Sequence, residues 1–152
     1  MLINFIQIDK TNYLDCISLE LKPEQEFFVA SNAQSLLDAH YNEGLYPLGI
    51  TLDGILVGFL LYDFDCEIAG WSLSRFMIGK EYQGKGIGKA ALESFIKYFY
   101  QSVGYENLFA SISVDNEASL SLFTQLGFRI LERVEYTHRL HTYVEYKVVL
   151  HP

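Results

Sequence analysis

The spacing of apolar positions along the chain predicts a mixture of strands and helices. Period-two alternation and short apolar runs indicate strands at 3–8, 46–52, 55–64, 69–78, 108–114, 128–138 and 143–150. Helical spacing indicates helices at 12–21, 24–39, 90–100 and 116–127, with Pro23 separating the first two. Asp53-Gly54 is a hairpin signal between the second and third strands. The resulting order, βααβββαβαββ, predicts an α/β protein.

Length and composition fit one folded domain covering residues 1–152. The chain has 152 residues, of which 50% are hydrophobic, and a chain of this size buries roughly 70% of the surface that its unfolded form exposes. Cys16 and Cys66 show no metal-ligand spacing, so we expect reduced thiols and no metal site. Residues 1–8 lack the basic start of a signal peptide, and the longest apolar run, 55–62, is far shorter than a membrane span. We therefore expect a cytoplasmic protein that does not bind membranes.

The chain is acidic, with a formal net charge of −8. Nucleic-acid binding needs a basic face that neutralises phosphates, so this charge argues against a nucleic-acid partner. A negatively charged protein attracts positively charged ligands instead. The charge therefore favours a small cationic substrate.

A glycine-rich run follows the strand at 69–78 and opens the next helix. Glycine allows a sharp turn and a close approach of the backbone to a ligand, and the free N–H groups of a first helical turn attract an anion. The order of strand, glycine turn and helix therefore predicts a site for a phosphorylated small molecule. The run itself reads Gln83-Gly84-Lys85-Gly86-Ile87-Gly88-Lys89.

Three phosphate-binding loop patterns compete for this run. The nucleotide P-loop pattern fits as far as Lys85, but Gly86 then stands where magnesium binding needs a hydroxyl. The dinucleotide pattern fits from Gly86 to Ala91, but it should follow a hydrophobic strand directly, within the first βαβ unit of the chain. The third pattern, [QR]-x-x-G-x-[GA], fits from Gln83 to Gly88. A glycine-rich loop without a ligand would also explain the run.

A second segment selects among these patterns. It runs from Asn116 to Phe128, reads NEASLSLFTQLGF and follows the strand at 108–114. Together the two segments resemble the pyrophosphate loop and the N-x-x-A-x-x-[LF]-Y-x-x-x-G-F helix of GNAT-type N-acetyltransferases. Within that family the chain is most similar to the bacterial spermine/spermidine (diamine) acetyltransferases, on the segments 28–33, 46–48, 56–59 and 75–78. The resemblance implies the GNAT fold, in which helices flank a mixed, mostly antiparallel sheet.

The resemblance also implies how acetyl-CoA is held. The strand before the loop would splay from its neighbour and receive the pantetheine arm, and an N–H near Met77 would face the thioester oxygen. Strand backbone contacts would come from Phe76, Met77 and Ile78. The pyrophosphate would lie against Gln83, Gly84, Lys85, Gly86, Ile87, Gly88 and Lys89. The remaining cofactor contacts, toward the thiol end, would come from Asn116, Ser119 and Phe123.

Phe123 departs from the resembled pattern. This position usually holds a tyrosine, the general acid for the CoA thiolate, and phenylalanine has no proton to donate. One explanation is that the thiolate leaves unassisted, because a thiol is acidic enough near neutrality to depart as an anion. A second is that another residue, such as Tyr82 or Tyr143, donates the proton. A third is that the protein binds CoA without efficient catalysis. These three explanations remain open.

Ser74 is a second departure, because polyamine acetyltransferases often carry an acidic residue at this position. Acids elsewhere in the chain are candidates for the general base or for binding a cationic substrate. They are Glu24 and Glu26 near the first helix junction, and Asp63, Asp65 and Glu67 at the end of the strand at 55–64 and in the turn after it. His138 and His141, which flank a predicted turn, are less specific candidates for the base.

The sequence therefore predicts transfer of an acetyl group from acetyl-CoA to a primary amine of spermine or spermidine, by direct attack in a ternary complex. A non-catalytic CoA-binding module is a competing interpretation, which Phe123 and Ser74 support. Acetylation of a different small amine or of a peptide also fits the motifs, and a nucleotide-binding protein fits the glycine-rich run less well. The resemblance further implies a possible homodimer.

Overall fold

A computed structural model describes all residues 1–152 of the protein. It contains one central seven-stranded sheet. Its strand order is β1-β2-β3-β4-β5-β7-β6, and every neighbouring pair is antiparallel except β4 and β5. The strands are β1 (Ile3–Ile6), β2 (Leu45–Leu52), β3 (Ile55–Asp65), β4 (Gly70–Ile78), β5 (Leu108–Ser113), β6 (Arg129–His138) and β7 (His141–Leu150). The predicted α/β fold with a mixed, mostly antiparallel sheet is confirmed.

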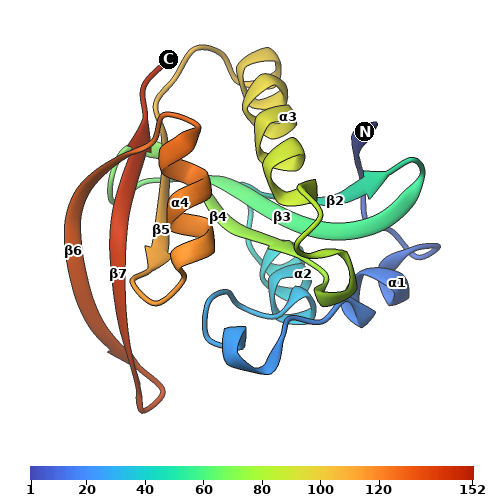
Figure 1. Cartoon of the computed structure of the whole chain (residues 1–152), viewed down its shortest axis with the longest axis horizontal. Coiled ribbons are helices and arrows are strands. Elements are labelled where there is room, and N and C mark those ends of the chain that lie inside the picture. Colours follow the sequence, from blue (N-terminus) through green and yellow to red (C-terminus); the bar gives the residue numbers. More distant parts are fainter.

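Helices cover both faces of the sheet. Figure 1 shows α3 (Ile87–Ser102) and α4 (Glu117–Gln125) in front of it and α2 (Asn32–Tyr41) behind it, beside the short α1 (Tyr13–Ser18). The larger apolar cluster lies under α3 and α4, and a smaller one, around Cys16, Phe59 and Met77, lies under α1 and α2. None of the four helices combines the length and the apolar composition needed to cross a membrane.

Tight turns close two long hairpins. Asp53 and Gly54 join β2 to β3 with φ angles of +50° and +84°, as the Asp-Gly signal predicts. Arg139 and Leu140 join β6 to β7 with φ angles of +49° and +66°, a left-handed conformation that neither side chain favours. Figure 1 shows this second hairpin projecting at one end of the sheet, beside the segment that precedes α2.

The helix predicted at 24–39 is wrong in its first half. Residues Pro23–Gln25 form a single 3₁₀ turn, and α2 begins only at Asn32. Ser31 is its N-cap, because the Ser31 hydroxyl accepts a hydrogen bond from the backbone N–H of Gln34 at 3.1 Å. The residues between 26 and 31 are therefore a loop, and its side chains take part in the site described below. The strand predicted at 3–8 and the helix predicted at 12–21 are also shorter than expected.

Candidate active site

A cleft opens where β4 and β5 diverge. The two strands pair only at Trp71 with Leu108 and at Ser72 with Phe109, although β4 continues to Ile78. Beyond these pairs the parallel strands separate, and neither completes its hydrogen-bond ladder with the other. An extended ligand that carries amide groups can pair with strand backbone at such a gap.

A cavity of about 380 Å³ extends from this gap to the glycine loop. The side chains and backbone of its walls come from the end of β4, from the loop, from α4 and from the segment before α2. Most of the residues predicted to hold the cofactor lie on these walls, namely Phe76, Met77, Ile78, Gln83, Gly84, Gly88, Asn116 and Ser119. Within the glycine-rich run, Lys85 and Lys89 are exposed, whereas Ile87 is buried in the core.

The glycine loop has the backbone that an anion site needs. Gly84 and Gly86 have φ angles of +74° and +79°, and Gly86 is the N-cap of α3. A Cβ at either position would meet no atom within 4 Å, so these glycines are required by backbone conformation and not by crowding. The free N–H groups and the dipole of a 16-residue helix then face the cleft with no acidic residue in the first turn. These features fit the pyrophosphate of CoA.

Side-chain hydrogen bonds hold this cleft in shape. Gln83 donates to the carbonyl of Ile78 at 2.9 Å and exchanges two amide hydrogen bonds, of 3.0 and 3.1 Å, with Gln25. The loop is thereby tied both to β4 and to the 3₁₀ turn across the cleft. Asn116 caps α4, because its Oδ1 accepts a hydrogen bond from the backbone N–H of Ser119 at 3.2 Å.

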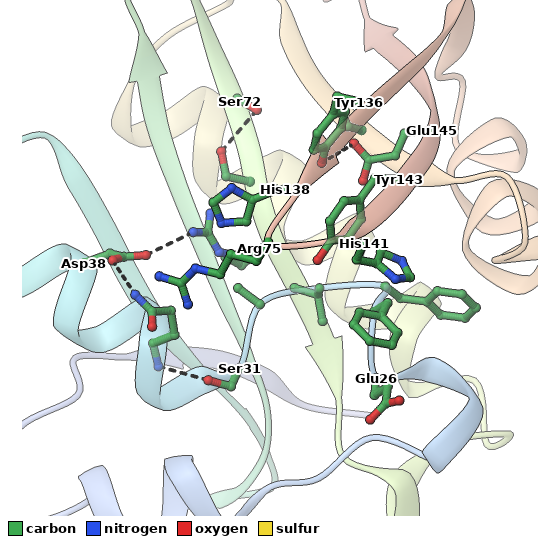
Figure 2. A pocket seen from close by; sticks show the side chains of 18 of the residues that line it. Glu26, Ser31, Asp38, Ser72, Arg75, Tyr136, His138, His141, Tyr143 and Glu145 are labelled. Carbon is green, nitrogen blue, oxygen red and sulfur yellow. Dashed lines mark hydrogen bonds and ion pairs between the residues drawn. The ribbon is translucent and has the colours of Figure 1, made fainter.

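A second cavity, here called the acceptor cavity, has a volume of about 880 Å³. Figure 2 shows the side chains that converge on it from the segment before α2, from α2, from β4 and from the β6–β7 hairpin. Four carboxylates and two guanidinium groups line it, so its formal charge is negative. They belong to Glu26, Asp38, Asp65 and Glu145, and to Arg75 and Arg139.

The acceptor cavity and the β4–β5 cleft share a wall. A small cavity of about 40 Å³ lies at the cleft end beside Phe123 and Ser119. Ser74 and Ser111 line both this small cavity and the acceptor cavity, as do Phe28 and Val29. A group bound at the end of the cleft therefore meets a group in the acceptor cavity at these two serines.

Polar and aromatic pairs fix the walls of the acceptor cavity. Arg75 forms an ion pair with Asp38 at 3.3 Å. The Tyr136 hydroxyl donates to Glu145 at 3.0 Å, and burial, together with this carboxylate, raises the pKa of Tyr136 to about 12. Phe27 stacks on His141 with ring centres 3.8 Å apart, so the loop before α2 is joined to the β6–β7 hairpin.

The predicted substrate-binding residues are distributed over these cavities. Glu26, Asp65 and Ser74 line the acceptor cavity, and Glu24 lines an adjoining cavity of about 390 Å³. Asp63 does not line these cavities, but the Asp63 carboxylate accepts a hydrogen bond from the Ser74 hydroxyl at 2.8 Å. Burial raises the pKa of the Asp63 carboxyl above its usual value, against the opposing effect of the Ser74 hydrogen bond.

The three positions considered for the general acid lie in different places. Phe123 is 4% exposed, and its ring packs edge-on against Phe76 and Phe128 at the cleft end. Tyr82 lies in the short turn before the glycine loop and lines neither the cleft nor the acceptor cavity. Tyr143 lines the acceptor cavity but not the small cavity at the cleft end.

Sequence reasoning missed part of the acceptor cavity. It predicts only a helix at Asp38, and only strands or a turn at Tyr136, Arg139 and Glu145. A signal was present in the hairpin, because Tyr136 pairs with Tyr143, and alternate positions along paired strands share one face. That face carries Tyr136, His138, His141, Tyr143 and Glu145, all of which line the cavity.

Comparisons with known proteins agree with this geometry. The model of the acetyltransferase (GNAT) family matches residues 9–128. The probable spermine N(1)-acetyltransferase of Bacillus subtilis subsp. natto (strain BEST195) is 30% identical over 135 residues, which are 85% of this chain and 89% of that protein. The spermine/spermidine N(1)-acetyltransferase of Bacillus subtilis (strain 168) is 29% identical over 135 residues, which are again 85% of this chain and 89% of that protein.

Solved structures share the fold at low sequence identity. The GNAT-family acetyltransferase from Bacillus anthracis superimposes with a TM-score of 0.79 at 14% identity, over 98% of this chain and 94% of that one. The spermidine N-acetyltransferase from Vibrio cholerae in complex with CoA and spermine has a TM-score of 0.77 at 12% identity, over 98% and 95%. The chain therefore belongs to the acetyltransferase (GNAT) family and is an N-acetyltransferase that uses acetyl-CoA as its acetyl donor.

Proposed function

We propose that the protein acetylates a primary amine of a linear polyamine such as spermine or spermidine. Two curated relatives at about 30% identity are named for this activity. The Vibrio cholerae neighbour was crystallised with CoA and spermine. The observation that carries the proposal is the negatively charged acceptor cavity, which meets the CoA cleft at Ser74 and Ser111.

The chemistry of the acceptor cavity suits a flexible polycation. Its carboxylates outnumber its guanidinium groups, and Asp38 is already paired with Arg75, which leaves Glu26, Asp65 and Glu145 to attract ammonium groups. The adjoining cavity adds Glu24 and Asp115. Aromatic rings on the walls provide apolar surface for methylene chains and faces for cation–π contacts. They belong to Phe27, Phe28, Tyr136 and Tyr143.

The reaction places distinct demands on the residues around the shared wall. Acetyl-CoA supplies the acetyl group as a thioester at the cleft end. We assign the strand backbone around Met77 to the thioester oxygen, because preorganised N–H groups stabilise the charge that develops there. The attacking amine must be neutral and must lose a proton as the amide forms. Phe123 offers no proton, so in this proposal the thiolate departs without help from that position.

Release of free CoA tests the proposal directly. The purified protein would receive acetyl-CoA with spermine, spermidine, putrescine, lysine or a short peptide, and a thiol reagent would report CoA. We expect turnover with the polyamines, with kcat/KM higher for spermine and spermidine than for lysine or the peptide. Mass spectrometry of the product would show one added acetyl group.

Two different outcomes would change the assignment. Turnover with lysine or the peptide, but not with polyamines, would identify another amine as the acceptor. Thermal stabilisation by acetyl-CoA without turnover of any amine would indicate a CoA-binding module without catalysis. A Cys66→Ser variant serves as the assay protein in a parallel series, because the exposed Cys66 thiol itself reacts with the reagent.

A further inference from the structure

A hydrogen-bonded pair of residues on β3 and β4, Asp63 and Ser74, lies at the wall between the two cavities. Ser74 lies on the wall that the acceptor cavity shares with the cleft end. Its hydroxyl donates to Asp63 Oδ2 at 2.8 Å, and its oxygen lies 3.3 Å from the hydroxyl oxygen of Ser72. Figure 2 shows Ser72 at the edge of the acceptor cavity. Asp63 itself is not on the lining of either cavity.

A β-bulge lies in β4 at Ser74. In the β3–β4 register Leu61 pairs with Arg75 and Tyr62 pairs with Leu73, so Ser74 has no partner. The extra residue shifts the alternation. Leu73 and Phe76 pack with the cluster under α3 and α4, while Arg75 turns the other way, toward Asp38. Bulges often redirect a side chain beside an active site. Here the bulge places Ser74 and Arg75 on the same face of the sheet, where the Ser74 hydroxyl lies on the wall between two cavities.

We propose that Ser74 and Asp63 form a proton relay, in which Ser74 takes the proton of the attacking amine and passes its own hydroxyl proton to Asp63. The proposal rests on the proposed N-acetylation and deepens it. In the step, the amine nitrogen forms the C–N bond with the thioester carbon, and the C–S bond breaks. The proton lost by nitrogen moves to the serine oxygen, and the serine proton moves to Oδ2. The CoA thiolate then takes this proton from Asp63, or leaves as the anion while Asp63 releases the proton to water, so atoms and charge balance.

The surroundings of the partly buried Asp63 suit a proton acceptor. Asp65, two residues along β3, raises the pKa of the Asp63 carboxyl further, whereas the Arg75 guanidinium on β4 lowers it. On β2 the paired residue is Leu45, which carries no charge. A carboxylate with a raised pKa is a stronger base and holds the transferred proton better than an exposed one.

The matched variants are Asp63→Asn, Ser74→Ala and Asp65→Asn. Asparagine keeps the shape of Asp63 and can still accept the Ser74 hydrogen bond, but it cannot take a proton. Asp65→Asn removes the same charge two residues away, from a carboxylate that lines the acceptor cavity without contacting Ser74. Each variant would be assayed with the best amine acceptor of the panel, and its melting temperature with and without acetyl-CoA would confirm folding and cofactor binding.

We expect Asp63→Asn and Ser74→Ala each to lower kcat about 10²-fold near neutral pH, because loss of a general base typically has this effect. The loss should shrink as pH rises, since hydroxide replaces the relay. The double variant should be no worse than either single variant, because the two residues act as one unit. Asp65→Asn should raise KM and should lower kcat far less than Asp63→Asn does, because it weakens the Asp63 base without removing it. Ser74→Asp, combined with Asp63→Asn, should restore part of kcat by placing a carboxylate on the shared wall.

Three results would overturn the relay. Asp63→Asn with kcat within about threefold of the unchanged protein would show that no proton passes to Asp63. A shift in melting temperature without a shift in kcat or its pH profile would reduce the pair to a cross-strand structural contact. Failure of every amine would overturn both proposals together. If only a non-polyamine amine is acetylated, the proposed substrate fails while the relay is still tested with that amine.

Discussion

At the scale of single residues, Phe123 has an aromatic ring that shapes the cofactor cleft but no hydroxyl that could transfer a proton. Its buried ring closes the cleft end between Phe76 and Phe128 and offers no proton. A thiol has an ordinary pKa near 8.5, so its anion is a good leaving group. We therefore expect Phe123→Tyr to change kcat by less than about threefold, measured by CoA release, because no acid is missing there. An increase of about tenfold or more would show instead that protonation of the thiolate limits the reaction.

The two cysteines give a residue-scale test of burial. Burial raises the pKa of the Cys16 thiol to about 11, whereas Cys66 is exposed. Because the thiolate is the reactive form, we expect a thiol reagent near about pH 8 to modify Cys66 rapidly and Cys16 only after unfolding. The measurement is the number of thiols modified in the native and the denatured protein. Rapid modification of the native Cys66→Ser variant would contradict the buried position of Cys16.

At the scale of elements, the glycine loop can be tested apart from general backbone strain. Gly86 and Gly44 have nearly the same φ angles, +79° and +81°, and a Cβ at either would meet no atom within 4 Å. Alanine at each position should therefore cost about 1–2 kcal/mol of stability, from the left-handed backbone alone. Only Gly86→Ala should also weaken acetyl-CoA binding in calorimetry, because Gly86 opens α3. Equal affinities in the two variants would argue that the loop does not contact the cofactor.

The elements also show what the sequence predicts and what it does not. The motif segments were predictable because glycine spacing and an Asn cap are local signals, and the structure places them around one cleft. The start of α2 was not, because the residues from 24 to 31 keep an apolar spacing that also suits a helix. The Ser31 cap and the Pro23 turn decide against it. The Ser74 bulge was equally hidden, because it depends on the register of β3 against β4.

At the scale of the whole molecule, the acceptor cavity is a product of tertiary contacts. Its walls come from segments that are distant in sequence, such as Glu26, Asp65 and Glu145. The spacing of apolar residues in these segments predicts the helices and strands that carry the cavity residues, but it does not predict which of these elements pack together. The Phe27–His141 stack, for example, joins the segment before α2 to the last hairpin. The net charge of the sequence indicated attraction of a cation, and in the structure several of the carboxylates line the acceptor cavity.

The net charge of −8 leads to a prediction about salt. A polyamine carries several positive charges, so the field of the protein and the carboxylates of the acceptor cavity attract it more strongly than they attract a monoamine. Raising ionic strength from about 0.01 to 0.15 M shortens the screening length from about 30 to 8 Å. We expect kcat/KM for spermine to fall about 3–10-fold over this range, while the value for a monoamine changes less.

The variant Glu145→Gln tests whether spermine is attracted by the charge of the acceptor cavity or by the net charge of the whole protein. It removes one cavity carboxylate, yet its amide oxygen can still accept the hydrogen bond from Tyr136. We expect a smaller salt effect on spermine and little change for the monoamine. The same charge removed from an exposed residue of α3, in Glu93→Gln, should alter both substrates only slightly, because Glu93 lies outside the acceptor cavity. Equal salt effects in the two variants would place the attraction in the overall charge and not in this cavity.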